Sequence, residues 1–428
     1  MQNNDFDKEI DINDLSLANF MGIKDKDLFK KAKMFFQFSE GFKKRGYYTY
    51  RRPLASASSN RSLVRDPITG EEKEMIMMGS NNYLGLASHP KVIEATEKAL
   101  RKYGLGSTGA SLLNGTFDVH QELEARLAKL KGCKDAVLFG SGYAANLGTL
   151  TAILGDGDIV ISDELNHASI IDGCRLSGAN IEIFNHNNMK QLESILKNTN
   201  VGNKGKLIVV DGVFSMDGDM ANLPKIVELA QKYNAYTMVD EAHATGVVGS
   251  QGKGSLEHYN VRGKIDLIVI TLSKALGCFG GAVCCNDEKV AEFLRFFSRS
   301  NFFSTSFPPA LAAGAIAAID ILEKEPERIK KLWSNINYML ENLKSMGYNT
   351  GNTQSAIIPV IIGDDQKLRD MSVDFQKANI YLGAIPYPAV PKGEARFRLT
   401  VMAIHTQEDL NQTLDVFKTV GKKFGVIK

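Results

Sequence analysis

The sequence has few of the residues that mark disulfide-rich, metal-binding or nucleic-acid-binding proteins. It contains one tryptophan and five cysteines in 428 residues, and its 51 Lys and Arg nearly balance its 49 Asp and Glu, for a net charge of +2. Bulk charge therefore does not indicate a nucleic-acid partner. The cysteines fit neither a disulfide framework nor a zinc site, so we expect a reducing compartment and no metal. They are Cys133, Cys174, Cys278, Cys284 and Cys285.

Long apolar runs are also missing. The longest run of small apolar residues, 309–322, is shorter than the ~20 residues that a membrane-spanning helix needs, and it contains Asp320. We expect a buried helix there. The N-terminal stretch MQNNDFDKEIDIND is acidic and lacks the basic start and apolar stretch of a signal peptide. These features together predict a cytoplasmic protein.

From Met78 to about Ser300, apolar β-rich runs alternate with amphipathic segments of helical length. This alternation predicts an α/β fold built from βαβ units around a mostly parallel sheet, with the active site at the carboxyl ends of the strands. The predicted strands are 135–139, 158–162, 206–212, 235–240 and 266–272, and the predicted helices include 120–130 and 223–233.

The chain changes character on both sides of this region. Residues 1–75 are polar and mixed, and we expect an N-terminal arm with a short ribbon. We assign 76–305 to a large domain. After Phe307 comes a long helical region, then short apolar runs at 355–363 and 395–401, and a final helix that starts near Thr406. This order predicts a smaller C-terminal α+β domain, residues 306–428.

The strongest local signal is TLSKALGCFGG, residues 271–281, at the end of an apolar strand. A lysine between small hydroxyl residues and glycines at a strand end can bind an aldehyde as a Schiff base. Thr271 and Ser273 could then bind a nearby phosphate. Alone, the motif is better explained by a surface lysine in a glycine-rich turn.

The preceding strand supports the interpretation of Lys274 as a cofactor-binding residue. In AYTMVDEAHATG, residues 235–246, Asp240 ends an apolar strand and His243 follows three residues later. A carboxylate there can pair with a protonated pyridine nitrogen, and the histidine can lie near the ring hydroxyl. Either residue alone would also fit a solvated turn, but both at neighbouring strand ends favour a cofactor site.

Two further segments fit the same site. His167 follows the strand that ends at Ser162, and an imidazole there can stack on a flat aromatic cofactor and orient the substrate. In GSGYAAN, residues 140–146, a glycine-rich turn opens a helix and points backbone N–H groups at an anion. Glycines that open helices are common, so the second segment supports a cofactor site only together with the other predicted residues.

These residues belong to a longer series that resembles the α-oxoamine synthases, which are fold-type I pyridoxal-phosphate enzymes related to aspartate aminotransferase. The resemblance runs in order from about residue 45 to the C-terminus. It is carried by MGSNNYLGLASHP (78–90), GLGSTGASLLNGTFDVHQELE (104–124), NHASIIDG (166–173), GVFSMDGDMANLP (212–224), VDEAHATG (239–246), TLSKALG (271–277) and ARFRLTVMAIHT (395–406).

The resemblance implies pyridoxal phosphate as cofactor and a role for each matching residue. Lys274 resembles the lysine that carries the cofactor, Asp240 the partner of the pyridine nitrogen, and His167 the histidine stacked on the ring. The remaining positions are carried over in the same way. His243 and Ser215 match groups near the ring hydroxyl; Gly142, Tyr143 and Thr271 match phosphate-binding positions; Ser304 and Thr305 match residues given by the neighbouring subunit; Arg398 and Asn81 match contacts to the amino-acid substrate.

The reaction implied by the resemblance joins an amino acid to an acyl-CoA with loss of CO2 and gives an α-amino ketone. It also implies a homodimer with shared active sites. One position departs from the family pattern: Ser111 stands where many members have an arginine. In the aminolaevulinate-forming branch that arginine meets the succinyl carboxylate, so its absence argues against a dicarboxylic acyl-CoA.

The branch is less clear than the family. The stretch 161–193 and the segment 78–87 resemble serine palmitoyltransferase, which predicts L-serine and a long-chain acyl-CoA as substrates. The C-terminal YPAVPKGEARFRL and VGKKFGVIK instead resemble 2-amino-3-oxobutyrate CoA ligase, which uses glycine and acetyl-CoA. A third alternative is 8-amino-7-oxononanoate synthase. A catalytically silent scaffold subunit would be expected to lack the lysine, so Lys274 argues against it.

The N-terminal arm offers a further interpretation. Between residues 29 and 52, basic residues alternate with aromatic ones. Such a segment can lie on an anionic membrane surface, where a long-chain product would be delivered. Packing across the dimer is the slightly favoured alternative, because basic amphipathic patterns are common. Both alternatives stay open.

Overall fold

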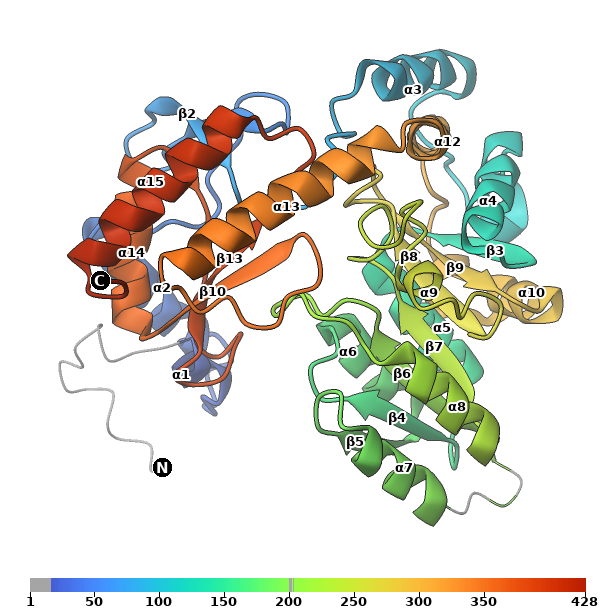
Figure 1. Ribbon diagram of the computed structural model, residues 1–428. Coiled ribbons are helices and arrows are strands. Elements are labelled where there is room, and N and C mark those ends of the chain that lie inside the picture. Colours follow the sequence, from blue (N-terminus) through green and yellow to red (C-terminus); the bar gives the residue numbers. More distant parts are fainter. Residues whose placement is uncertain (1–16, 200–201, 203) are drawn as a thin grey trace.

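The structure is a computed structural model that describes residues 17–199, 202 and 204–428 (Figure 1). The acidic N-terminal stretch used above lies outside the described residues. Figure 1 shows a large α/β region that contains β3 to β9 and a second group of elements around β10, β13 and the C-terminal helices. The long helix α13 leads from the first group to the second. The boundaries 1–75, 76–305 and 306–428 stay predictions.

A seven-stranded sheet forms the centre of the large region, in the order β3-β9-β8-β7-β6-β4-β5. Strands β8, β7, β6, β4 and β5 run parallel, whereas β9 is antiparallel to both of its neighbours. The predicted mostly parallel sheet is therefore confirmed. Its strands are β3 Asp135–Phe139, β4 Ile159–Asp163, β5 Asn180–Phe184, β6 Lys206–Asp211, β7 Tyr236–Asp240, β8 Leu267–Thr271 and β9 Gly281–Cys285.

All five predicted strands are present, and each end lies within one residue of the prediction. Successive side chains along a strand point to opposite faces, and both faces of this sheet are buried. Val209 and Met238 belong to one buried cluster, while Val210 and Val239 belong to the other. The apolar runs could therefore be identified as strands, because nearly every position in them is buried.

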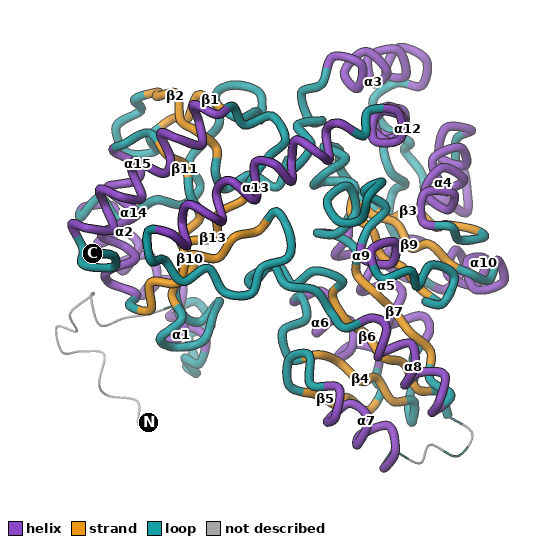
Figure 2. Tube along the Cα trace, in the orientation of Figure 1, coloured by secondary structure: helices purple, strands orange, loops and turns teal. Residues whose placement is uncertain are grey.

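Helices cover both faces of the sheet (Figure 2). The predicted helix 223–233 is α8, whose start is fixed by the Asn222 side chain, which accepts from Lys225 N, and whose end is fixed by Asn234 at φ 50°. The helices are α1 Ala18–Met21, α2 Lys30–Lys44, α3 Pro90–Tyr103, α4 Asp118–Lys131, α5 Gly142–Ile153, α6 Ala168–Ser177, α7 Met189–Asn198, α8 Leu223–Tyr233, α9 Ser255–His258, α10 Glu288–Phe297, α11 Arg299–Phe302, α12 Pro309–Lys324, α13 Glu327–Ser345, α14 Asp365–Lys377 and α15 Gln407–Lys423.

The run 309–322, expected to be a buried helix, lies within α12, which packs against α3 and α4. Ala312, Ala315 and Ile319 are fully buried in the main core. Within the part of the chain that is described, no helix has both the length and the apolar character needed to cross a membrane.

Two small sheets complete the fold. The strands β10 Ile357–Gly363, β13 Ala395–Thr400 and β12 Gly383–Ile385 form an antiparallel sheet. The ribbon β1 Arg61–Arg65 and β2 Glu72–Met77 pairs with the short strand β11 Ile380–Tyr381. The N-terminal ribbon is therefore joined to the C-terminal part of its own chain.

A fully buried ion pair ties α4 to the loop that follows β7. Lys131 Nζ lies 3.0 Å from a Glu241 carboxylate oxygen and 2.8 Å from the Lys253 carbonyl oxygen, and both charged side chains have no exposed area. Glu241 also accepts from Ser255 N. Because Glu241 stands between Asp240 and His243, this pair fixes the loop that carries both predicted site residues.

We expect Lys131→Met to lower the free energy of unfolding by about 3 kcal/mol, because it leaves the Glu241 carboxylate buried without its cation. Urea denaturation followed by tryptophan fluorescence measures the change. The matched control is Lys98→Met, which breaks an exposed pair with Glu94 on α3. Equal denaturation midpoints for the two variants would contradict the role given to Lys131.

Candidate active site

The carboxyl ends of four neighbouring strands meet at a cavity of about 200 Å3. Asp211 ends β6, Asp240 ends β7, Thr271 ends β8, and His167 follows β4 and caps α6. This is the sheet edge at which the sequence places the site. The cavity brings together eight predicted residues: Gly142, Tyr143, His167, Asp240, His243, Thr271, Ser273 and Lys274.

Asp240 is buried and held in place by two hydrogen bonds. Asn146 Nδ2 donates to one carboxylate oxygen at 2.6 Å, and Ala242 N donates to the other at 2.8 Å. The Asn146 Oδ1 atom is buried without a hydrogen-bond partner among the described residues. Asn146 was not predicted from the sequence, although it lies on the helix α5 that opens with the predicted glycine turn.

A second carboxyl group, Asp211, lies beside Asp240 in the register of β6 and β7. Burial, followed by the charge of Asp240, raises the pKa of Asp211 well above its usual range. The backbone N–H of His167 donates to Asp211 at 3.1 Å. Asp211 was missed as a site residue, although its place at the end of a predicted strand could have identified it.

Lys274 provides the amine of the site. Burial, helped by the charge of the Arg398 guanidinium and opposed by the charges of Asp240 and Asp211, lowers the pKa of Lys274 to about 8. Its Nζ atom lies 2.8 Å from His243 Nε2. A pKa of about 8 leaves the amine partly unprotonated near neutral pH, which is the form that reacts with an aldehyde.

His243 continues a chain of hydrogen bonds away from Lys274. Burial and the charge of Lys274 lower the pKa of His243 well below its usual range, so that its ring is neutral. If Lys274 donates to Nε2, the other nitrogen, Nδ1, carries the hydrogen and donates to the Tyr83 hydroxyl at 2.7 Å. Tyr83 then donates to Asn81 Oδ1 at 3.2 Å. Tyr83 is fully buried and was missed in the sequence, since aromatic residues in buried segments are usually core residues.

Arg398 ends this chain on the C-terminal sheet. Its Nη1 donates to Asn81 Oδ1 at 3.1 Å, and its Nε donates to the carbonyl oxygen of Ser215 at 2.5 Å. Ser215 therefore contributes its backbone oxygen to the arrangement. No carboxylate pairs with Arg398 among the described residues, whereas the nearby Arg396 is paired with both Asp217 and Glu394. Arg398 is the guanidinium that is available to a substrate carboxylate.

The opposite end of the cavity suits a phosphate. Helix α5 begins at Gly142, and a Cβ atom there would lie 3.2 Å from Thr271 Cβ, so only glycine fits without a shift. Thr271 Oγ1 and Ser273 Oγ lie 2.7 Å apart beside this helix start. The helix start and the hydroxyls suit the phosphate of pyridoxal phosphate, Lys274 its aldehyde and Asp240 its ring nitrogen. The residues present thus fit the expected cofactor.

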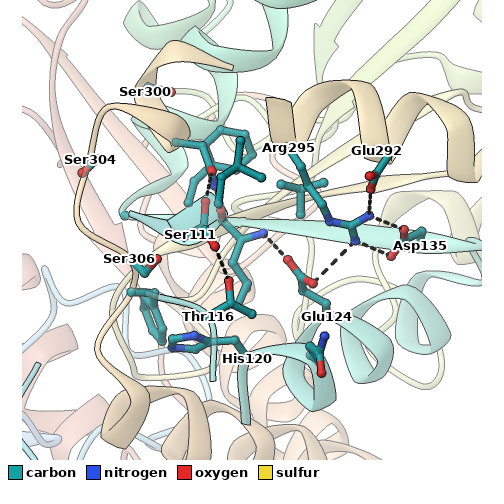
Figure 3. A pocket seen from close by; sticks show the side chains of 18 of the residues that line it. Ser111, Thr116, His120, Glu124, Asp135, Glu292, Arg295, Ser300, Ser304 and Ser306 are labelled. Carbon is teal, nitrogen blue, oxygen red and sulfur yellow. Dashed lines mark hydrogen bonds and ion pairs between the residues drawn. The ribbon is translucent and has the colours of Figure 1, made fainter. Parts of the chain in front are cut away.

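Two predicted residues lie elsewhere in the single chain. Ser304 and Thr305 line a larger cavity of about 500 Å3 together with Ser111. Figure 3 shows Ser111 in the middle of this cavity and Ser304 on the loop at its edge. Neither residue lines the cavity around Lys274, and their contribution to a neighbouring subunit's site stays a prediction.

One arginine lines the larger cavity, and nearby carboxylates balance its charge. Arg295 lies within ion-pair distance of Glu124, Asp135 and Glu292 (Figure 3). Burial raises the pKa of Glu124 to about 7. Ser111 itself donates to Asn301 Oδ1 at 2.7 Å, so this position holds a short, neutral side chain that is already hydrogen-bonded.

Comparison with known proteins agrees on the family. Residues 73–417 match the family of class I and II aminotransferases. The 8-amino-7-oxononanoate synthase of Thermoanaerobacter pseudethanolicus is 45% identical over 388 residues, which cover 91% of this chain and 96% of that protein. The 4-hydroxy-2,2'-bipyrrole-5-methanol synthase of a Serratia species is 42% identical over 411 residues, 96% of this chain, and the chain spans 63% of that relative's length.

A solved structure agrees with these relatives. The serine palmitoyltransferase of Sphingomonas wittichii superposes with a TM-score of 0.89 at 34% identity, and the match covers 94% of this chain and all of that one. The resemblance found in the sequence is confirmed at the level of family and fold. The branch is not decided, because relatives from more than one branch match nearly the whole chain.

The lowered pKa of Lys274 predicts how the cofactor-free protein takes up pyridoxal phosphate. Because only the unprotonated amine attacks the aldehyde, the uptake rate should rise with pH and level off above about 8. Stopped-flow absorbance between pH 6 and 10 measures it, with Nα-acetyl-lysine in parallel to correct for titration of the cofactor itself. A rate that still climbs at pH 10, as expected for an ordinary lysine of pKa about 10.4, would contradict the assignment.

Proposed function

Because the chain belongs to the α-oxoamine synthases, pyridoxal-phosphate acyltransferases of fold type I, we propose that it condenses an amino acid with an acyl-CoA and releases CoA and CO2. The product is an α-amino ketone. The observation that carries the proposal is the continuous line of hydrogen bonds from Lys274 through His243, Tyr83 and Asn81 to Arg398, beside the buried Asp240. This line connects the amine of Lys274 to a guanidinium that can bind a carboxylate, and the buried acid lines the same cavity as the amine.

Each side chain has a role that its surroundings support. Bound pyridoxal phosphate supplies an electron sink for the bond broken at the α-carbon. Asp240 keeps the ring nitrogen protonated, and Lys274, with its pKa lowered to about 8, takes the α-proton. The neutral His243 accepts a hydrogen bond from Lys274 and so holds the amine in place. His167 is exposed at the cavity, where its ring can cover the cofactor.

Arg398 orients the amino acid. A guanidinium binds a carboxylate through two parallel hydrogen bonds, which fixes which bond at the α-carbon lies perpendicular to the cofactor ring. Its hydrogen bonds to the Ser215 carbonyl and to Asn81 hold the guanidinium plane. Lysine can neither bind in this bidentate way nor keep both contacts.

For the substrates, we propose L-serine and a long-chain acyl-CoA. The resemblance of residues 161–193 to serine palmitoyltransferase supports this choice, as does the TM-score of 0.89 to such an enzyme. Ser111 and its neutral contact with Asn301 also favour an acyl chain without a terminal carboxylate.

Formation of 8-amino-7-oxononanoate is the second candidate. It is favoured by the 45% identity to such a synthase, against 34% to the serine palmitoyltransferase. The name of that product describes an α-amino ketone, with the amine on carbon 8 and the ketone on carbon 7, so the reaction class is the same. The product also carries a carboxylate at the far end, for which Ser111 offers no charge. Glycine with acetyl-CoA, indicated by the C-terminal motifs, is the third.

Release of CoA across a substrate panel distinguishes these candidates. The panel combines serine, alanine and glycine with acetyl-, pimeloyl- and palmitoyl-CoA. We expect turnover to be fastest with serine and palmitoyl-CoA. Fastest turnover with alanine and pimeloyl-CoA, or with glycine and acetyl-CoA, would replace our substrate proposal, and no turnover with any pair would contradict the proposed reaction.

The panel includes a matched pair of arginine variants. Arg398→Lys should raise the KM for the amino acid at least about tenfold, since a charged hydrogen-bonding pair is lost. Arg101→Lys, an exposed residue at the end of α3, is the control and should behave as the unaltered protein.

We also propose a homodimer whose partner supplies Ser304 and Thr305. This proposal is supported by the family resemblance and by the fact that, within one chain, Ser304 and Thr305 line a different cavity from Lys274. We propose a cytoplasmic location from the cysteine content.

The arm at residues 29–52 supports a proposed contact with an anionic membrane surface. It contains eight basic residues and one acidic residue, whereas the whole chain has a net charge of +2. Its inner side is occupied, because Phe38 is buried against Phe20 and Phe42, and Tyr47 donates to Asp370 at 2.7 Å. The turn between α1 and α2 instead exposes Leu28 by 78% and Phe29 by 71%. The same turn contains Asp25 and Asp27, which pair with Lys30 and Lys33. Exposed apolar side chains next to lysines suit insertion among anionic headgroups.

Sedimentation with lipid vesicles tests this contact. We expect binding to vesicles of phosphatidylcholine with phosphatidylserine, weakening at high salt, and loss of binding in the double variant Leu28→Ser, Phe29→Ser. The control is Leu176→Ser, which removes an equally exposed side chain on α6. If the arm variant instead changed the dimer and left vesicle binding as before, the arm would belong to the subunit interface.

A further inference from the structure

The loop 212–220, which follows β6, joins the large sheet to the C-terminal sheet. On the C-terminal side, the Ser215 carbonyl accepts from Arg398 Nε at 2.5 Å, and the Asp217 carboxylate accepts from Arg396 Nη1 at 2.5 Å. Gln354 N also donates to the Gly218 carbonyl at 2.9 Å. The position of the substrate-binding Arg398 therefore depends on where this loop lies.

His186 holds the same loop to the large sheet. It follows β5, and its ring bridges two carboxylates: Nδ1 lies 3.1 Å from Asp163 at the end of β4, and Nε2 lies 2.7 Å from Asp219 in the loop. Its ring meets Phe214 edge-on, with centroids 4.4 Å apart. Burial alone would lower the pKa of His186, but the two hydrogen-bonded carboxylates raise it to about 10. At neutral pH both hydrogen bonds are thus made by a charged imidazolium, which strengthens them.

The residue after His186 reinforces the attachment. Asn187 N donates to the second carboxylate oxygen of Asp163 at 2.9 Å, and its side-chain amide donates to the Met220 carbonyl at 3.1 Å. Its Oδ1 accepts from Asn222 N at 3.1 Å. The loop is therefore fastened at its end by His186 and Asn187 and at its middle by the two arginines.

We propose that His186 is a positioning residue for amino-acid binding: by fixing Asp219 to the large sheet, it sets the Ser215 carbonyl and hence Arg398 at the working distance from Lys274 and Asp240. This rests on the proposed function only in taking Arg398 as the group that binds the substrate carboxylate. His186 itself is half-buried outside the cavity that holds Lys274 and makes no contact with that residue among the described contacts. Its effect on catalysis is therefore indirect.

The test compares His186→Ala, His186→Gln and the control His258→Ala, an exposed histidine on α9, in the full-length protein loaded with pyridoxal phosphate. Amino-acid affinity is measured from the change in cofactor absorbance on titration with serine, alanine and glycine. We expect His186→Ala to weaken affinity on the order of tenfold while kcat changes far less, because hydrogen bonds to a charged group are lost away from the reacting atoms. Glutamine, which keeps one hydrogen bond to a carboxylate, should restore part of the affinity.

A second readout does not depend on the cofactor. Hydrogen–deuterium exchange of the cofactor-free protein should show faster exchange of the 212–220 amides in His186→Ala, with 235–246 unchanged. The inference is overturned if affinity and loop exchange match the unaltered protein, or if the denaturation midpoint and kcat fall while affinity is kept. If His186→Ala does not fold, His186→Gln and Asp219→Asn decide by the same measurements.

Titration of the unaltered protein with amino acids distinguishes a failure of this inference from a failure of the proposed function. If it shows no absorbance change with any amino acid, the proposed function fails. The exchange rates of the loop would then still decide whether His186 fastens it.

Discussion

The burial of one amine, Lys274 Nζ, is the constraint on which the rest of the site depends. Burial lowers the pKa of Lys274 to about 8, and the same burial keeps His243 neutral, so that a proton acceptor faces the amine at 2.8 Å. Tyr83 and Asn81 then carry the hydrogen-bond chain to Arg398. An exposed lysine would stay protonated and could serve neither as aldehyde-binding group nor as base.

The site also requires two sheets to stay at a fixed distance from each other. Lys274 and Asp240 stand on the seven-stranded sheet, and Arg398 stands on the small antiparallel sheet. Arg396 and Arg398 have different tasks on the same strand: the first is neutralised by Asp217 and Glu394, while the second keeps its charge for a ligand. The sheets are linked by α13 and by the 212–220 loop, so substrate binding depends on contacts that lie outside the cavity.

Much of the fold could be predicted because strands that are buried on both faces of a sheet consist almost entirely of apolar residues. The central strands are continuous apolar runs, and α8 has a capping Asn222 and a terminating Asn234. The strand β5 was missed because four of its five residues are exposed, and β9 because it is short and begins at the last glycine of the TLSKALGCFGG motif. Lys274, Asp240 and His167 could be found because strand ends converge. Tyr83 and Asn146 could not, since their partners are 160 and 94 residues away and only the folded chain joins them.

The most direct test of the account asks where the cofactor is attached. The protein purified with pyridoxal phosphate is reduced with borohydride, digested, and mapped by mass spectrometry. The account predicts a pyridoxyl group on Lys274, in the peptide that contains TLSKALG. Attachment to a different lysine, or a folded protein that acquires no such group, would contradict it.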